Sequence, residues 1–194
     1  METGNQNAKA ALRKKIRDGL KLFTKEKRKS DSKKLCAKLK GQSFFQGAAS
    51  VLFFAPLPTE VDLWPLLEES FAAGKVVALP RFDPANQNYV ACRVQNLAGE
   101  IVPGQFSIRE PHKNCAEIPL ANLDLILVPG IAFDLRGNRL GRGKGFYDRL
   151  LQKVRGLKVG IAFDGQIVEK IPAEAHDARM NFILTPTRCL KIAG

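Results

Sequence analysis

Histidine and paired cysteine are scarce in this sequence of 194 residues. The chain has two histidines, His112 and His176, which stand far apart, so a histidine-rich metal site is excluded. Its four cysteines form no Cys-x-x-Cys pair, which favours reduced, half-buried thiols over a zinc site or a disulfide framework. A histidine-based catalytic triad stays open, although no motif supports one.

Long apolar runs are missing as well. No segment approaches the roughly 20 apolar residues that a membrane-spanning helix needs. The N-terminus from Met1 to Gln6 lacks the charged-then-apolar layout of a secretory signal. We therefore expect a soluble, cytoplasmic protein that contacts no membrane. The length fits a single domain over 1–194, with a helical N-terminal segment at 7–41 and an α/β body at 50–194.

Positive charge is abundant and unevenly distributed. The formal net charge is +12, and residues 1–40 hold 14 Lys and Arg against 4 Asp and Glu. The other residues hold 17 and 15, so the body is almost neutral. Two interpretations compete. The N-terminal charge is either a footprint for nucleic acid or acidic lipid, or a solvated helical face with a few cations given to a small anionic ligand.

Hydrophobic periodicity predicts an α/β fold. Leu12, Ile16, Leu20 and Phe23 recur at helical spacing, and a second helical pattern runs on to Gly41. Later segments alternate between buried strands and a helix. The strands are expected at 51–55, 76–80, 89–94, 123–128, 158–163 and 182–185, and the helix at 63–73. This order favours an open, largely parallel sheet covered on both faces, with segment 83–119 as a ligand cover or a small antiparallel addition.

A glycine-rich basic stretch at 137–149 is the most informative motif. Alternating glycines allow tight turns that aim several N–H groups at one anion, and the N-terminus of a following helix, expected to reach about Arg155, would add its dipole. Arg139, Arg142 and Lys144 supply charged donors. The stretch is not a P-loop, because Asn138 and Gly145 stand where that motif needs Gly and Ser or Thr. It predicts a phosphate site.

Phosphate sites commonly bind Mg²⁺, which prefers oxygen ligands. Asp148 follows the glycine-rich stretch directly, and Asp177 precedes the last expected strand. Asp134 and Asp164 also follow strand ends, so the sequence leaves the choice among the four open. Lys9 and Arg13 stand four residues apart and share one helix face, either as a cation pair on the phosphates or as a solvated edge.

The chain resembles the 5-formyltetrahydrofolate cyclo-ligase (methenyltetrahydrofolate synthetase) family essentially from end to end. The specific part is the signature at 125–134 followed by the loop at 137–149. The resemblance implies a three-layer α/β/α sandwich and an ATP-dependent ligase. Its reaction closes 5-formyltetrahydrofolate to 5,10-methenyltetrahydrofolate and releases ADP and phosphate, through an iminium phosphate intermediate. Such chemistry needs positioning and charge neutralisation more than a protein nucleophile.

The resemblance also implies roles for individual residues. Arg142 and Lys144 would be catalytic, and Asp148 and Asp177 would hold Mg²⁺. The residues implied to bind ATP are Lys9, Arg13, Arg139, Leu140, Gly141, Arg142, Gly143, Lys144, Gly145, Phe146 and Tyr147. The residues implied to bind the folate are Ala55, Glu60, Phe106 and Tyr147, with Glu60 pairing with the pterin N–H groups. Phe146 replaces a usual tyrosine and Phe106 a tryptophan of some members, which removes polar contacts.

The expected partners are therefore ATP with Mg²⁺ and a folate that could carry a polyglutamate tail, bound by a monomer. The alternative from another class is a nucleic-acid-binding relative of the fold that uses the basic segment 9–40. Phe23 is the only aromatic residue there, and no RNA-binding motif is present, so nucleic acid is not expected.

Overall fold

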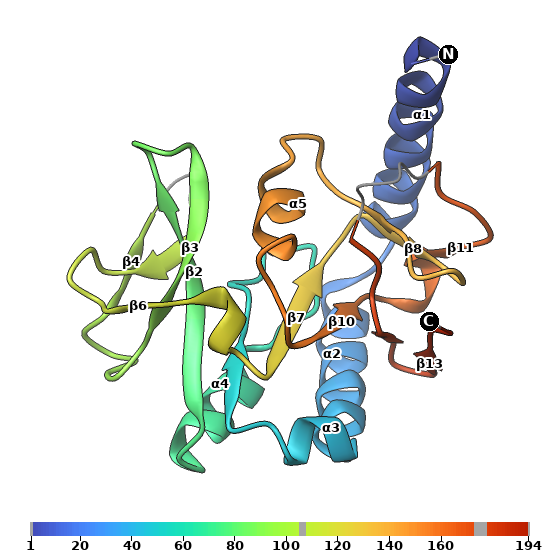
Figure 1. Ribbon diagram of the computed structural model, residues 1–194. Coiled ribbons are helices and arrows are strands. Elements are labelled where there is room, and N and C mark those ends of the chain that lie inside the picture. The colour runs from blue at the N-terminus through green and yellow to red at the C-terminus, as the bar shows by residue number, and fades with distance from the viewer. Residues whose placement is uncertain (1, 105–107, 173–177, 194) are drawn as a thin grey trace.

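The computed structural model describes residues 2–104, 108–172 and 178–193, and its centre is an eight-stranded sheet (Figure 1). The strand order is β13-β12-β10-β7-β1-β2-β3-β6. The five strands from β12 to β2 pair in parallel, whereas β13, β3 and β6 join antiparallel at the edges. The bounds are β1 Ser50–Leu52, β2 Val76–Asp83, β3 Asn88–Arg93, β6 Glu117–Ile118, β7 Leu125–Pro129, β10 Leu157–Ile161, β12 Phe182–Leu184 and β13 Cys189–Lys191.

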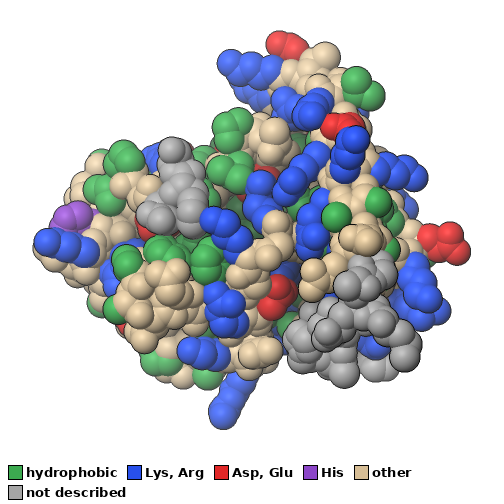
Figure 2. Space-filling model, turned by 90° about the horizontal axis from the view of Figure 1, so that it is seen from above, with side chains coloured by type: hydrophobic (Ala, Val, Ile, Leu, Met, Phe, Trp, Pro, Cys, Tyr) green, Lys and Arg blue, Asp and Glu red, His purple; other side chains and the backbone are tan. Residues whose placement is uncertain are grey.

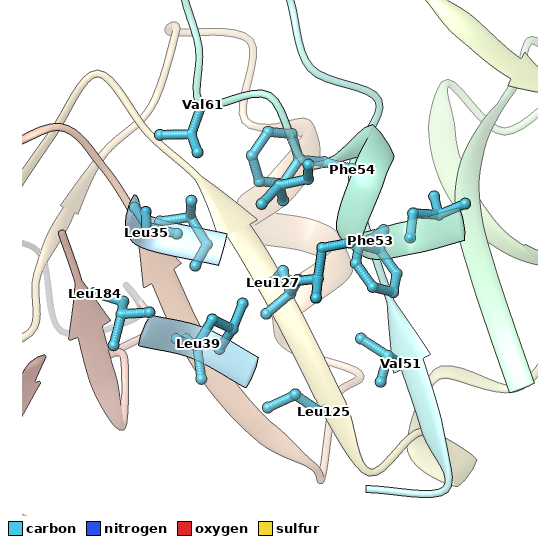
Figure 3. Packing of buried hydrophobic residues seen from close by; sticks show 14 of the residues in the cluster. Leu35, Leu39, Val51, Phe53, Phe54, Val61, Leu125, Leu127 and Leu184 are labelled. Atoms are coloured by element: carbon cyan, nitrogen blue, oxygen red, sulfur yellow. The ribbon is translucent and has the colours of Figure 1, made fainter. Parts of the chain in front are cut away.

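The central strand β7 shows why the apolar runs form a sheet that is covered on both faces. Its side chains from Leu125 to Val128 are fully buried, and they alternate between two separate cores. Leu125 and Leu127 face one core, together with Leu35 and Leu39 (Figure 3). Ile126 and Val128 face the other. Because burying one such side chain contributes about 2 kcal/mol, the run is stable only inside the sheet.

Helices form the layers on the two faces. The first core receives apolar side chains from α1 (Glu2–Lys21), α2 (Lys25–Lys40), α3 (Ser43–Gln46) and α4 (Trp64–Ala72). The second core receives those of α5 (Phe146–Leu151). Thr24 separates the first two helices, because its hydroxyl accepts the Lys27 N–H and caps α2. The predicted α/β fold is confirmed, and α1 projects beyond the sheet (Figure 1).

Several short elements complete the chain. Segment 83–119 forms the predicted antiparallel addition, with β4 (Ile101–Pro103) paired to β5 (Arg109–Pro111) and β6 paired to β3. A three-stranded sheet was not predicted. It consists of β8 (Ala132–Asp134), β9 (Arg139–Leu140) and β11 (Ile167–Val168), and short 3-10 turns lie at Leu120–Asn122 and Asp164–Gln166. Within the described ranges, no helix combines the length and apolarity needed to cross a membrane.

Candidate functional site

A cavity of about 440 Å³ lies where β1 and β7 end, at the carboxyl edge of the parallel strands. Parallel sheets commonly bind ligands at this edge, because the loops that follow neighbouring strands meet there. Figure 2 looks onto this end of the molecule, where Lys and Arg side chains gather around the projecting helix and towards the middle of the face. The cavity is lined by Arg17, Phe54, Ala55, Leu57, Glu60, Pro80, Tyr89, Ile108, Pro129, Gly130, Arg139, Gly141, Arg142, Lys144, Gly145, Phe146, Tyr147 and Asp148.

The glycine-rich loop leaves the β8–β9 hairpin and wraps one side of this cavity. Gly143 and Gly145 have φ angles of +103° and +66°, which favour glycine and allow the sharp path into α5. The expected helix dipole is a minor part of the site, because α5 has only six residues and ends at Leu151 rather than near residue 155. The side chain of Leu140 is buried in the core. The charged side chains of the loop therefore dominate its electrostatics.

Arg142 and Glu60 connect the two halves of the predicted site. Arg142 Nη2 lies 2.7 Å from Glu60 Oε1, although the family resemblance implies that the arginine binds the nucleotide and the glutamate binds the pterin. The Glu60 side chain is 13% exposed and that of Arg142 is 46% exposed. The backbone N–H of Leu57 donates to the other Glu60 oxygen at 3.0 Å, so this carboxylate is fixed at the cavity wall.

Arg139 and Asp148 form a second ion pair at the base of the loop. The Arg139 side chain is 5% exposed and lies over the Tyr147 ring at 5.7 Å, whereas Asp148 is 38% exposed and lines the cavity. The Nε atom of Arg139 is buried and has no hydrogen-bond partner in the part of the chain that is described. Both carboxylates that line the cavity in the described residues, Glu60 and Asp148, are thus paired with arginines of the same loop.

The predicted metal ligands do not form a complete site by themselves. Among the described residues, no three His, Cys, Asp or Glu side chains gather closely enough to hold a metal ion. Asp177 and Phe106 lie outside the described residues. Asp164 accepts hydrogen bonds from the hydroxyls of Thr185 and Thr187, at 2.5 and 2.6 Å, away from the cavity. Asp148 is the candidate that the cavity itself presents, and a single carboxylate suits Mg²⁺ that is shared with phosphates.

Aromatic side chains from β3 and from the start of α5 also line the cavity. Tyr89 on β3 packs edge-on against Phe146 at 5.6 Å and lies 6.2 Å from Tyr147. Burial raises the pKa of the Tyr147 hydroxyl, and the nearby Glu60 carboxylate raises it further, so the phenol stays neutral. Ala55, after β1, lines the same cavity. Sequence reasoning missed Tyr89, because a single aromatic residue in a strand carries no signal that separates packing from binding.

An arginine of the first helix contacts the glycine-rich loop. Arg13 Nε donates to the carbonyl of Gly141 at 2.8 Å. Partial burial lowers the pKa of Arg13, and so does the like charge of Arg17, whereas Asp148 raises it. Lys9 is half-buried and does not line the cavity, so its nucleotide contact stays a prediction. Arg17 does line it, and sequence reasoning missed this residue although it follows Arg13 by one helical turn.

Asp134 fixes the turn that leads into the glycine-rich loop. Its fully buried carboxylate accepts the backbone N–H groups of Arg136, Asn138 and Ile171, each at 2.9 Å, and the Asn138 amide at 2.8 Å. Every oxygen of this carboxylate is used, so Asp134 is a structural anchor rather than a metal ligand. The anchor ties the β8–β9 turn to the segment after β11.

We expect Asp134→Ala to lower the free energy of unfolding by about 3–5 kcal/mol, because several buried donors lose their acceptor. Urea unfolding followed by circular dichroism measures the loss. Asp134→Asn keeps the size and one acceptor and should lose less. A midpoint unchanged in the alanine variant would contradict this account of the anchor.

Comparison with known proteins gives a consistent result. A model of the 5-formyltetrahydrofolate cyclo-ligase family matches residues 5–186. The 5-formyltetrahydrofolate cyclo-ligase of Escherichia coli K12 is 37% identical over 145 residues, which cover 73% of this chain and 80% of that protein. The Mus musculus enzyme of the same name is 29% identical over 195 residues, covering 92% and 93%.

Solved structures agree with the fold. The 5,10-methenyltetrahydrofolate synthetase of Aquifex aeolicus superposes with a TM-score of 0.86 at 35% identity, over 96% of this chain and 93% of that one. The synthetase from Mycoplasma pneumoniae, at 19% identity and a TM-score of 0.74, supports the fold alone. By sequence and by fold, the chain belongs to the 5-formyltetrahydrofolate cyclo-ligase family.

Proposed function

We propose that the protein catalyses the ATP-dependent closure of 5-formyltetrahydrofolate to 5,10-methenyltetrahydrofolate, with release of ADP and phosphate. The observation that carries this proposal is the shared cavity. It is lined by a cation-rich glycine loop, which suits phosphates, and by the largely buried Glu60 carboxylate and aromatic side chains, which suit a pterin. The membership of the family supports the same reaction.

The proposed chemistry proceeds in two steps. The formyl oxygen attacks the γ-phosphorus of ATP, the bond from this phosphorus to the bridging oxygen of ADP breaks, and an iminium phosphate forms. The external nitrogen N10 then attacks the activated formyl carbon, loses its proton, and phosphate departs with the former formyl oxygen. Neither step requires a protein nucleophile, so the task of the chain is to hold two substrates in line and to neutralise charge.

Arg142 is expected to change partners for this role. In the ion pair with Glu60, the carboxylate offsets much of the guanidinium charge, and the Nη2 hydrogen directed at Oε1 is not available to a phosphate. We propose that the pterin N–H groups take over the Glu60 carboxylate, and that the released guanidinium turns to the transferring phosphoryl group together with Lys144. The exposure of Arg142, 46%, leaves its side chain room to move.

Among the described residues, the cavity offers Mg²⁺ one candidate carboxylate ligand, Asp148. Asp148 would contribute one carboxylate oxygen after exchanging its Arg139 partner, and Asp177 stays a prediction. When bound, Mg²⁺ would neutralise part of the phosphate charge and orient the phosphoryl group. Arg139, held against the Tyr147 ring, would then donate to a phosphate oxygen or remain with Asp148.

The folate would occupy the side of the cavity formed by Ala55, Glu60 and Tyr147, and Phe106 stays a predicted contact. The basic face around α1 would attract a polyglutamate tail, which is a polyanion (Figure 2). We also propose a single-domain, monomeric, cytoplasmic enzyme. No observation in the described residues favours the nucleic-acid alternative over this one.

The decisive test is an absorbance assay with purified protein, Mg²⁺, ATP and 5-formyltetrahydrofolate. We expect the near-ultraviolet absorbance of the methenyl product to rise only when ATP is present, with one phosphate released per product. Omitting Mg²⁺ or replacing ATP with ADP provides the controls. No rise at any enzyme concentration would refute the proposed function.

A further inference from the structure

Arg17 is a cation at the cavity wall that has no counter-ion among the described residues. It lies on α1, four residues after Arg13, and lines the cavity. The other two arginines that line it are engaged, Arg139 by Asp148 and Arg142 by Glu60. No hydrogen bond or ion pair joins the Arg17 side chain to any residue that the structure describes.

This guanidinium has a neighbour of the same charge. Arg17 and Arg13 are close enough for their repulsion to lower the pKa of Arg13. Arg13 cannot move away easily, because its Nε is bonded to the Gly141 carbonyl at 2.8 Å. Arg17 lines the cavity and Arg13 lies one helical turn away, so an anion bound at Arg17 would offset the repulsion between the two like charges.

We propose that Arg17 binds the triphosphate of the nucleotide, as a further contact beyond the glycine loop and Arg13. This inference rests on the proposed function. A triphosphate fits better than the carboxylates of the folate tail, because Arg13 fixes this part of α1 directly against the glycine loop. The chain of phosphates also carries several closely spaced charges, which match two arginines one helical turn apart.

An alternative is that Arg17 is one more solvated cation of a basic helix. The two accounts differ in how they treat Lys15 on the same helix. Lys15 is exposed, does not line the cavity, and stands two residues before Arg17, so it points to a different side of α1. Losing either charge changes the net charge by the same amount, but only Arg17 is expected to contact the ligand.

The test compares Arg17→Ala, Arg17→Lys and Lys15→Ala with the wild-type full chain. Equilibrium binding of ATP with Mg²⁺ at low salt gives the Kd, and the assay gives KM for each substrate. We expect Arg17→Ala to raise the Kd for ATP about fivefold and Arg17→Lys less, while Lys15→Ala stays within about twofold. The KM for 5-formyltetrahydrofolate should not change. The difference in the Kd for ATP between Arg17→Ala and the wild type should shrink as the salt concentration rises.

Three results would overturn the inference. If Lys15→Ala and Arg17→Ala weaken ATP binding equally, the effect is one of general charge. If Arg17→Ala changes only the KM for 5-formyltetrahydrofolate, Arg17 contacts the folate instead. An unchanged Kd in Arg17→Ala, with wild-type protein that binds ATP and forms product, would refute this contact but not the proposed function. Wild-type protein that binds no ATP would refute both. Thermal unfolding of each variant checks that the fold is retained.

Discussion

Arg142→Ala is expected to lower kcat by about 100-fold, because the transition state loses a charged donor worth on the order of 3 kcal/mol. Arg142 is exposed enough that its removal should leave the fold intact. The KM for 5-formyltetrahydrofolate should stay the same or fall. In the variant, the Glu60 carboxylate no longer has Arg142 as a competing partner when the pterin binds. The absorbance assay under saturating ATP separates the two parameters.

Two controls make this result specific. Arg142→Lys keeps the charge but loses the planar fork, so its kcat should lie between those of the wild type and the alanine variant. Arg136→Ala removes a charge from the preceding turn, outside the cavity lining, and should leave kcat within about twofold. An Arg142→Ala enzyme with the wild-type kcat would remove this residue from the chemistry.

The sheet could be predicted from the sequence because its central strands are continuous apolar runs. Leu125 to Val128 is buried on both faces, and such a run has few stable positions other than the middle of a parallel sheet. The second helical pattern that runs on to Gly41 corresponds to α2, which Thr24 caps. The small sheet β8–β9–β11 could not be predicted, because strands of two or three residues have no periodicity to detect.

The site could be predicted only in part, and the reason is distance along the chain. The glycine loop is a local motif, so the phosphate site it predicts rests on residues 137–149 alone. Arg142 contacts Glu60, which is 82 residues away in the sequence, and no local pattern predicts this contact. Helical periodicity places Arg17 on the same helix face as Arg13, but the sequence does not distinguish it from the other cations of α1 as a site residue. Its place at the cavity comes from the folded chain.

The partner exchange of Arg142 predicts a second large effect, at Glu60. Glu60→Gln is nearly isosteric and leaves an oxygen able to accept the Leu57 N–H, so the loop should fold as before. The pterin loses a charged acceptor worth about 1.5–3 kcal/mol, and we expect the KM for 5-formyltetrahydrofolate to rise about 10- to 100-fold. A wild-type folate KM in this variant would contradict the role of Glu60.

The same variant should act in the opposite direction on the nucleotide. Without the Glu60 charge, Arg142 is no longer held by its ion pair, and ATP should bind at least as tightly as in the wild type. A double-mutant cycle of Glu60→Gln and Arg142→Ala tests this coupling by equilibrium ATP binding without folate. If Arg142 exchanges partners, the effect of Arg142→Ala on the Kd should be larger in the Glu60→Gln background than in the wild type. Additive effects would mean that the ion pair has no influence on the nucleotide, and that Arg142 binds phosphate without first leaving Glu60.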